Sequence, residues 1–414
     1  MSEEKRASIK KIQATGLMRK LMADYFYELD RASKAGTPKV AWCTSVGPAE
    51  LLLSLGFLVY YPENHGAMLG ATRGASQYIP AANAVGYSPD ICSYLTSDVG
   101  AFLKNETPLS RAYEGIDGIP RPDVLVYNTN QCRDVQDWLS WYSREFKVPA
   151  LGISTYRNVG EITQDMLTSI EKQIKALIPT LEKISGNSFD IDKLRQTLAL
   201  SYECTQLWKK ILETNTSVPA PISFFDETIH MGPAVVLRGS ETALEYYRVL
   251  LRELEDRVEQ KEGAVSEEKF RLYWEGMPIW GKLRDLAEFF IELKTAVIVS
   301  SYCNSWIFDS FDPEDPFMSM ARAYTEIFIV RDESYKEAYI QDMVHKYKVD
   351  GILFHDAKTC PNNSNNRYGM PERLEKKLGI PTLTINGDLN DLRCYSEEQA
   401  KTNIEAFIEQ LEAT

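Results

Sequence analysis

The seven cysteines are the residues of this chain best suited to chemistry, and their spacing narrows what that chemistry is. Their number is odd and they are widely separated, which disfavours a framework of disulfide bonds. No Cys-x-x-Cys pair occurs, so neither a thioredoxin-type redox pair nor a zinc ribbon is indicated. The count alone leaves two interpretations open, inert buried thiols or soft ligands of a metal centre. The cysteines are Cys43, Cys92, Cys132, Cys204, Cys303, Cys360 and Cys394.

Other signatures of catalysis are few. The sequence has no G-x-x-x-x-G-K-[ST] phosphate loop, no H-E-x-x-H zinc motif and no G-x-S-x-G nucleophile motif. Glu63 and His65, in "YYPENHG", follow a predicted strand, as His355 does in "ILFHDAKT". We predict that these three side chains deliver protons. A turn or helix-capping role for the Glu63 carboxylate is an equally open alternative.

Short apolar runs that alternate with helical segments must position these residues. "KVAWCTS", "FLVYYPEN", "PDVLVYNTNQC" and "PALGIST" form one such series. The second half repeats the pattern with "FRLYWEGMPIW", "TAVIVSSYCNSW", "VDGILFHDAKTC" and "IPTLTINGDLNDLRC". Strands that alternate with helices indicate parallel sheets covered on both faces. We therefore predict an α/β protein with two similar lobes, each a mostly parallel sheet flanked by helices.

The same pattern predicts the division of the chain. Residues 1–36 form an N-terminal helical segment, and lobe one covers 37–160. Residues 161–215 are almost purely helical and connect the lobes. Lobe two covers 216–414, with a helical insertion at about 240–265.

Six of the cysteines fall at the predicted carboxyl ends of strands or in loops nearby, which is where ligands bind in parallel sheets. Lobe one contributes Cys43, Cys92 and Cys132, and lobe two contributes Cys303, Cys360 and Cys394. Cys204 lies within a predicted helix, and we expect it to belong to the core. Three thiols from each of two facing lobes favour an iron–sulfur cluster held between them.

Composition limits the partners. The net charge is −13, which disfavours nucleic acid as the main ligand. No apolar run approaches the roughly 18 residues that a membrane-spanning helix needs. The start, "MSEEKRASIKK", lacks the apolar segment of a signal peptide. We therefore expect a cytoplasmic protein that acts on a small molecule and binds neither nucleic acid nor membrane.

Taken together, several motifs resemble those of the 2-hydroxyacyl-CoA dehydratase and benzoyl-CoA reductase superfamily. They occur in order along nearly the whole chain: "KVAWCTSVGPAELL", "YYPENHGA", "GYSPDICSY", "YNTNQCRD", "YWEGMPIW" and "FHDAKTCPNNSN". The resemblance implies two α/β lobes with a 4Fe–4S cluster between them, held by Cys92, Cys132 and Cys360. It also implies that Ser45 and Glu63 lie near the cluster.

The chain departs from the dehydratase pattern at Cys303 and Cys394, which the dehydratases lack. With Cys43 they make a second set of three, and two such sets resemble the double-cubane branch, in which one sulfide bridges two 4Fe–4S units. This resemblance implies a reductase for small molecules, supplied with electrons by a separate homodimeric ATP-hydrolysing 4Fe–4S activator. We expect such a protein to be a homodimer, with Glu63, His65 and His355 as proton sources.

The alternatives are kept beside this interpretation. The first is a subunit of a 2-hydroxyacyl-CoA dehydratase or benzoyl-CoA reductase with a single 4Fe–4S cluster. In it Ser45 and Glu63 act on the substrate, and Cys43, Cys303 and Cys394 are bystanders. An electron-transfer or maturation protein without catalysis is the second, and an iron-free α/β binding protein is the third.

Overall fold

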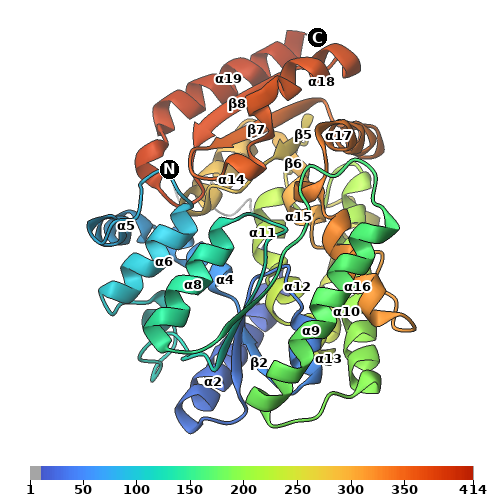
Figure 1. Cartoon of the computed structure of the whole chain (residues 1–414). Helices are drawn as coiled ribbons and strands as arrows, with labels where there is room; N and C mark the ends of the chain where they lie inside the picture. Colours follow the sequence, from blue (N-terminus) through green and yellow to red (C-terminus); the bar gives the residue numbers. More distant parts are fainter. Residues whose placement is uncertain (1–10, 414) are drawn as a thin grey trace.

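The computed structural model describes residues 11–413 and contains two four-stranded parallel sheets (Figure 1). The first has the order β2-β1-β3-β4, and the second has the order β6-β5-β7-β8. The predicted two-lobe α/β fold is therefore confirmed. The strands are β1 (Val40–Cys43), β2 (Leu58–Tyr60), β3 (Val124–Asn128), β4 (Ala150–Ile153), β5 (Phe270–Glu275), β6 (Thr295–Ser300), β7 (Gly351–Ala357) and β8 (Thr382–Gly387).

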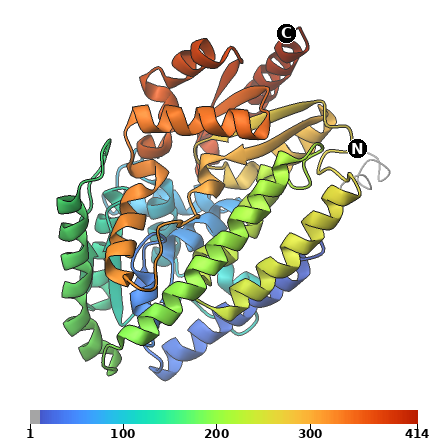
Figure 2. The same cartoon turned by 90° about the vertical axis from the view of Figure 1, so that its right-hand side faces the viewer.

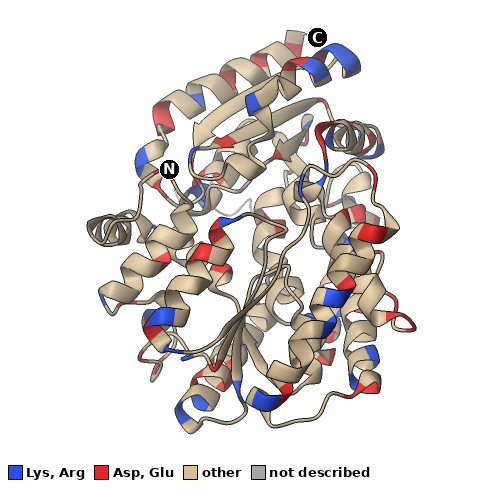
Figure 3. Cartoon of the chain, in the orientation of Figure 1, with Lys and Arg blue, Asp and Glu red and all other residues tan. Residues whose placement is uncertain are grey.

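The strands are nearly continuous apolar runs because helices cover both faces of each sheet. All residues of β1 and all residues of β6 are buried. Charged side chains lie mainly on the outer helices, and the strands are largely free of them (Figure 3). In the first lobe α8 (Asp134–Phe146) packs on β3, and α9 (Gln164–Ser185) packs on β4.

The second sheet is covered in a similar way. Here α14 (Leu283–Glu292) packs on β6, and α18 (Met370–Leu378) and α19 (Glu397–Ala413) pack on β8. A third element, α17 (Glu333–Tyr347), also contacts β6.

Three long helices run side by side along the outside of the molecule (Figure 2). They are α2 (Thr15–Ala35), α10 (Ile191–Glu213) and α13 (Glu241–Glu259), and α13 contacts both of the others. The predicted N-terminal helical segment, 1–36, contains α2, and its first ten residues lie outside the described part. Within residues 11–413 no helix has both the length and the apolar character to span a membrane.

The remaining helices are short and mostly lie at the carboxyl ends of the strands. They are α3 (Ala49–Ser54), α4 (Pro62–Ala71), α5 (Ala75–Ala84), α6 (Ser93–Leu103), α7 (Pro108–Ala112), α11 (Phe224–His230), α12 (Gly232–Val236), α15 (Ser301–Asn304) and α16 (Pro316–Glu326), with 3₁₀ turns η1 (Thr214–Thr216), η2 (Trp280–Lys282), η3 (Phe328–Val330), η4 (Pro361–Asn363), η5 (Asn365–Tyr368) and η6 (Leu392–Cys394).

The two sheets have equivalent strand orders, so each lobe contains one point at which the strand order reverses. In the first sheet the chain leaves β1 toward β2 and later returns to β3 on the other side of β1. In the second sheet β5 is flanked by β6 and β7 in the same way. The point where strand order reverses is the usual ligand site of an open parallel sheet. The segments that follow β1, β3, β5 and β7 are therefore the places to look for a functional site.

Candidate functional site

A cavity of about 340 Å³ is lined by residues of both lobes. Cys92 and Cys132 reach it from the first lobe, and Cys360 reaches it from the second. Ser45 and Glu63 line the same cavity. The structure therefore gathers the three cysteines of the first predicted set, together with the serine and glutamate that we expected beside them.

Each of these three cysteines lies one or two residues before a helix or a 3₁₀ turn. Cys92 is the N-cap of α6, Cys132 precedes α8, and Cys360 is the N-cap of η4. In each case the backbone N–H three residues later donates a hydrogen bond to the sulfur and lowers the pKa of the thiol. These donors are Leu95, Val135 and Asn363.

This shared arrangement matters because backbone N–H groups at the start of a helix stabilise negative charge. A thiolate that ligates iron is such a charge, and hydrogen bonds to sulfur are among the features that set a cluster's potential.

The three thiols also affect one another. Burial raises the pKa of Cys92 well above its usual range, and the Cys132 and Cys360 thiols raise it further. Burial likewise raises the pKa of Cys132 and of Cys360 to about 12. Three neighbouring thiols that are only partly exposed stay protonated unless a cation compensates for the loss of their protons.

The donor set therefore fits a soft metal centre. Among residues 11–413, no three His, Cys, Asp or Glu side chains stand at the closer spacing that a single metal ion would need. An iron–sulfur cluster is larger than one ion, so its ligands surround a cavity instead of converging on one point. Three thiols around one cavity match that requirement.

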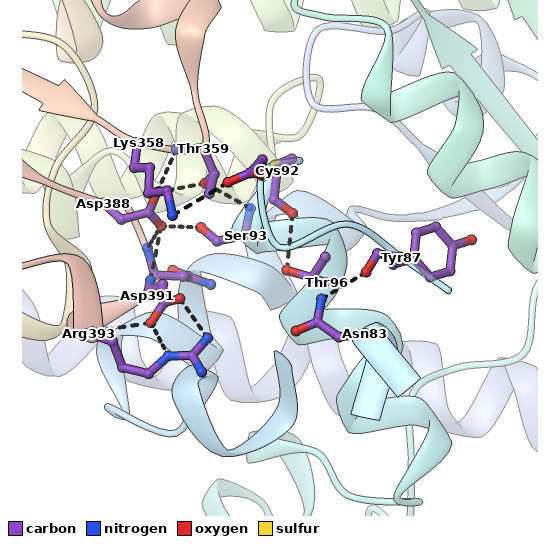
Figure 4. Close-up of polar contacts among 12 residues, drawn as sticks. Asn83, Tyr87, Cys92, Ser93, Thr96, Lys358, Thr359, Asp388, Asp391 and Arg393 are labelled. Carbon is purple, nitrogen blue, oxygen red and sulfur yellow. Dashed lines mark hydrogen bonds and ion pairs between the residues drawn. The ribbon is translucent and has the colours of Figure 1, made fainter. Parts of the chain in front are cut away.

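A buried carboxylate joins the two loops that carry Cys92 and Cys360 (Figure 4). Asp388, which is fully buried, follows β8. Its Oδ2 accepts hydrogen bonds from the backbone N–H and the hydroxyl of Thr359, at 2.8 and 2.6 Å. Its Oδ1 accepts the hydroxyl hydrogen of Ser93.

The two partners of Asp388 are also bonded to each other. The Thr359 hydroxyl oxygen accepts the backbone N–H of Ser93 at 3.0 Å. Ser93 directly follows Cys92, and Thr359 directly precedes Cys360. Asp388 thus fixes the position of a first-lobe cysteine relative to a second-lobe cysteine.

Ser45 and Glu63 form a pair at the edge of the cavity. Glu63 lies in the first turn of α4, and its Oε2 accepts the backbone N–H of Ser45 at 2.5 Å. Burial raises the pKa of Glu63 to about 6, although the Ser45 N–H, the Ser45 hydroxyl and the Gln131 side chain oppose that rise. Glu63 therefore changes its protonation state near neutral pH.

Arg238 holds the loop that carries Ser45. Its guanidinium is buried, and it donates to the carbonyl oxygens of Ser45 at 2.9 Å and Gly47 at 3.3 Å. It also forms a buried ion pair with Glu50 at 2.8 Å. These bonds hold the backbone at Ser45 in one position.

His65 and His355 are buried, and neither lines the cavity. His65 Nδ1 lies 2.5 Å from Asp98 Oδ1, and its Nε2 lies 2.7 Å from the Thr107 hydroxyl. Both ring nitrogens of His65 are thus engaged within the first lobe.

His355 contacts a residue of the cavity wall, Met277, without lining the cavity itself. Its Nδ1 lies 2.6 Å from the carbonyl oxygen of Met277, a residue that lines the cavity. Burial lowers the pKa of His355, which favours its neutral form. In this neutral form Nδ1 donates to the carbonyl, so the ring helps to position Met277.

The second predicted cysteine set is not gathered at the cavity. Cys43 ends β1 in the core, where Arg238, Glu50 and Glu63 are the charges that act on it. Cys303, also in the core, interacts with Glu227 and the Ser300 hydroxyl.

Cys394 is partly exposed in η6, beside Asp391 and Arg393. None of these three residues lines the cavity that contains the first set. Cys204 lies in α10 and is fully buried, as we expected.

Reasoning from the sequence did not find Asp388, Arg238 or the aromatic wall of the cavity. That wall contains Tyr94, Trp280 and Tyr302, and the Trp280 indole N–H donates to the Tyr94 hydroxyl. A lone arginine in the apolar segment "GPAVVLRGS" and an aspartate directly after a strand in "TINGDLND" were the available signals. Buried charges of this kind need a partner, which only the fold reveals.

Comparison with known proteins gives a consistent picture. Residues 44–411 match the family model described as 2-hydroxyglutaryl-CoA dehydratase, D-component. The chain is 31% identical to the (R)-2-hydroxyisocaproyl-CoA dehydratase alpha subunit of Clostridioides difficile, over 100% of this chain and 98% of that relative.

Two further relatives match over most of their length. One of the subunits of benzoyl-CoA reductase from Thauera aromatica is 27% identical, with 95% of this chain and 93% of the relative covered. The alpha subunit of lactoyl-CoA dehydratase from Anaerotignum propionicum is 28% identical, with 92% and 93% covered.

Proposed function

This chain belongs to the 2-hydroxyglutaryl-CoA dehydratase D-component family, and we propose that it is the subunit that holds a single 4Fe–4S cluster in an enzyme acting on acyl-CoA thioesters. Its relatives are subunits of dehydratases and reductases, so the chain is a component of an enzyme. The proposed reaction is the removal of water from a 2-hydroxyacyl-CoA, or the related reduction of an acyl-CoA.

The observation that carries this proposal is the convergence of Cys92, Cys132 and Cys360 on one cavity between the lobes. These three residues are the proposed ligands. When bound, the cluster supplies single low-potential electrons to the thioester. Cys92, Cys132 and Cys360 would supply three thiolates to such a cluster, and Ser45 and Glu63 line the same cavity.

Glu63 is the proposed proton-transfer group. A pKa of about 6 lets the carboxyl group hold a proton or accept one near neutral pH, as a general acid or base must. The backbone N–H of Ser45 fixes the orientation of the carboxylate, and the Ser45 hydroxyl also hydrogen-bonds to Glu63, which places both groups at the cavity where the substrate's oxygen is proposed to lie.

We propose that the aromatic side chains around the cavity limit the entry of water. Trp280 and Tyr302 are arranged edge to face with ring centroids 6.3 Å apart. A dry site strengthens the interactions of charged groups and protects a reactive species from side reactions.

The electron supply is proposed to come from a separate homodimeric ATP-hydrolysing 4Fe–4S activator. The relatives named as alpha subunits indicate that a second, different subunit completes the enzyme, in place of the homodimer expected with the double cubane.

The double-cubane reductase remains an untested prediction. The positions of Cys43, Cys303 and Cys394, away from the cavity of the first set, lend it no support. The single-cluster interpretation needs no further ligand, and we therefore favour it.

The test is the iron and acid-labile sulfide content of protein purified without oxygen. We expect about four irons per chain, as one 4Fe–4S cluster contains. About eight irons would favour the double cubane, and an iron-free protein after anaerobic reconstitution would refute both interpretations.

A further inference from the structure

The cavity is lined mostly by apolar side chains. Beside the three thiols, Ser45, Glu63, Asp134 and a few uncharged polar residues, the wall is apolar. The apolar part includes Met18, Met22, Ala67, Met68, Ala71 and Val235.

We propose that this apolar wall selects a thioester whose acyl group is uncharged and apolar, a branched aliphatic or aromatic chain, over one that ends in a carboxylate. The proposal rests on the function given above and names the substrate class of the same site.

Helix α4 carries both Glu63 and part of the apolar wall. Glu63 lies in its first turn, and Ala67 and Ala71 follow at spacings of four residues, so the three lie along one face. Met68 lines the cavity beside them. With a rise of about 1.5 Å per residue, the face extends ~12 Å from Glu63 to Ala71. A substrate whose reacting carbon lies near Glu63 can place its acyl chain along this face.

The charges at the cavity disfavour an anionic acyl group. The ionisable side chains that line it, apart from the cysteines and tyrosines, are the carboxylates Glu63 and Asp134. In the part of the chain that the structure describes, no Lys, Arg or His lines it. A terminal carboxylate on the substrate would lose its hydration and face charges of its own sign, which disfavours its binding.

The nearest guanidinium does not change this balance. Arg238 lies behind the Ser45 loop, 1% exposed, and its hydrogen bonds go to Glu50, Ser45, Gly47 and Val235. Its charge is already paired with Glu50, and it does not line the cavity. It is therefore not free to bind a second carboxylate.

The methionines indicate how strongly the cavity discriminates between apolar acyl groups of different shape. A thioether side chain is unbranched and polarisable, so it adapts to apolar groups of different shape and packs well against aromatic rings. Met18 and Met22 come from α2, whereas Met68 comes from α4. Apolar acyl groups of different shape are therefore expected to bind similarly, and charge is expected to discriminate much more than shape.

The experiment is calorimetric titration of the holoprotein, purified without oxygen and with its iron content measured. The ligands are non-reacting saturated thioesters: 4-methylpentanoyl-CoA, 3-phenylpropanoyl-CoA and glutaryl-CoA, with free CoA as the reference. We expect both apolar thioesters to bind at least tenfold more tightly than glutaryl-CoA. Glutaryl-CoA binding as tightly as the apolar pair would overturn the selectivity and leave the proposed function standing. If no thioester bound, the proposed function would fail and the selectivity with it.

A pair of variants tests the wall directly. Met68→Lys introduces a cation there, and Met68→Leu is the matched control that keeps it apolar. We expect Met68→Lys to raise the affinity for glutaryl-CoA at least tenfold and to weaken 4-methylpentanoyl-CoA, whereas Met68→Leu keeps the wild-type order. Met22→Lys, on a different helix, makes the same test if Met68→Lys does not fold. A correctly folded lysine variant with unchanged affinities would refute the proposal.

Discussion

Two sets of three cysteines come from the same two lobes, yet their surroundings differ. Cys132 and Cys360 lie in loops after β3 and β7, and Cys92 lies in the loop between α5 and α6; each directly precedes a helix or 3₁₀ turn or lies two residues ahead of one. Cys43 is still part of β1, and Cys303 follows β6 without an intervening loop. A strand end alone therefore does not expose a thiol to the cavity between the lobes.

The hydrogen bonds to sulfur differ as well. A backbone N–H acts on each sulfur of the first set and favours its thiolate. Cys303 has the Ser300 hydroxyl in this role, whereas the Glu227 carboxyl raises the pKa of the thiol beyond the effect of burial. Carboxylates act on the first set too, since Asp134 raises the pKa of all three of its thiols. The backbone donor at each sulfur, and not the absence of nearby carboxylates, therefore distinguishes the first set.

The largest expected effect separates the two sets outright. Cys360→Ala removes one of the three proposed ligands and the second lobe's only contribution to that set, so we expect iron content to fall at least tenfold. Cys303→Ala is the matched control, because it removes an equally small side chain next to β6 and should leave the iron content unchanged. Iron and sulfide assays on both variants, purified in parallel without oxygen, make the comparison. Equal iron loss in the two would return Cys303 to the ligand set.

An intermediate effect is expected at Asp388, which joins the Cys92 and Cys360 loops across the lobes. Asp388→Asn keeps the shape of the side chain but replaces one acceptor oxygen by an NH₂ donor facing Ser93 or Thr359. Loss of these buried hydrogen bonds should cost about 2–3 kcal/mol of unfolding free energy.

The matching control is Asp391→Asn, because Asp391 pairs with the half-exposed Arg393 in the same loop (Figure 4). We expect Asp388→Asn to lose more unfolding free energy than Asp391→Asn and to bind less iron, whereas the control keeps its iron. Denaturant unfolding of the iron-free protein and iron assays of the reconstituted protein measure the two effects. A variant that loses stability but keeps its iron would limit Asp388 to a structural role.

Much of the fold could be predicted because strand and helix periodicity is local. Two parallel sheets and membership of the superfamily were predicted and are confirmed. The helices α5 and α16 are among those that were not predicted. The first contains Pro80, and the second follows the aspartate- and proline-rich segment "DSFDPED", so both carry signals that normally indicate a break in a helix.

The site was harder to predict because it depends on how loops turn after the strands. Sequence position placed Cys43 and Cys132 alike, each at the end of a first-lobe strand. Only the fold distinguishes a cysteine inside β1 from one beyond β3. His65 likewise follows a strand, but its ring is held by Asp98 and Thr107 inside the lobe.

The smallest effect concerns Glu63, whose charge acts on one member of each set, Cys43 and Cys132. Burial raises the folded-state pKa of this carboxyl group from 4.5 to about 6, so the folded protein binds the proton more tightly than the unfolded chain does. The unfolding free energy therefore falls as the pH rises from about 4.5 to about 6, by at most about 2 kcal/mol.

Glu63→Gln removes this dependence, while its amide oxygen can still accept the Ser45 N–H. The difference in unfolding free energy between wild type and Glu63→Gln, measured on iron-free protein at pH 4.5, 6 and 7.5, should shift in favour of the variant as the pH rises. Because other titrating groups are common to both proteins, their effects cancel in this difference. A difference that stays constant across the three pH values would mean that Glu63 has an ordinary pKa, and its assignment as the proton-transfer group would lose its physical basis.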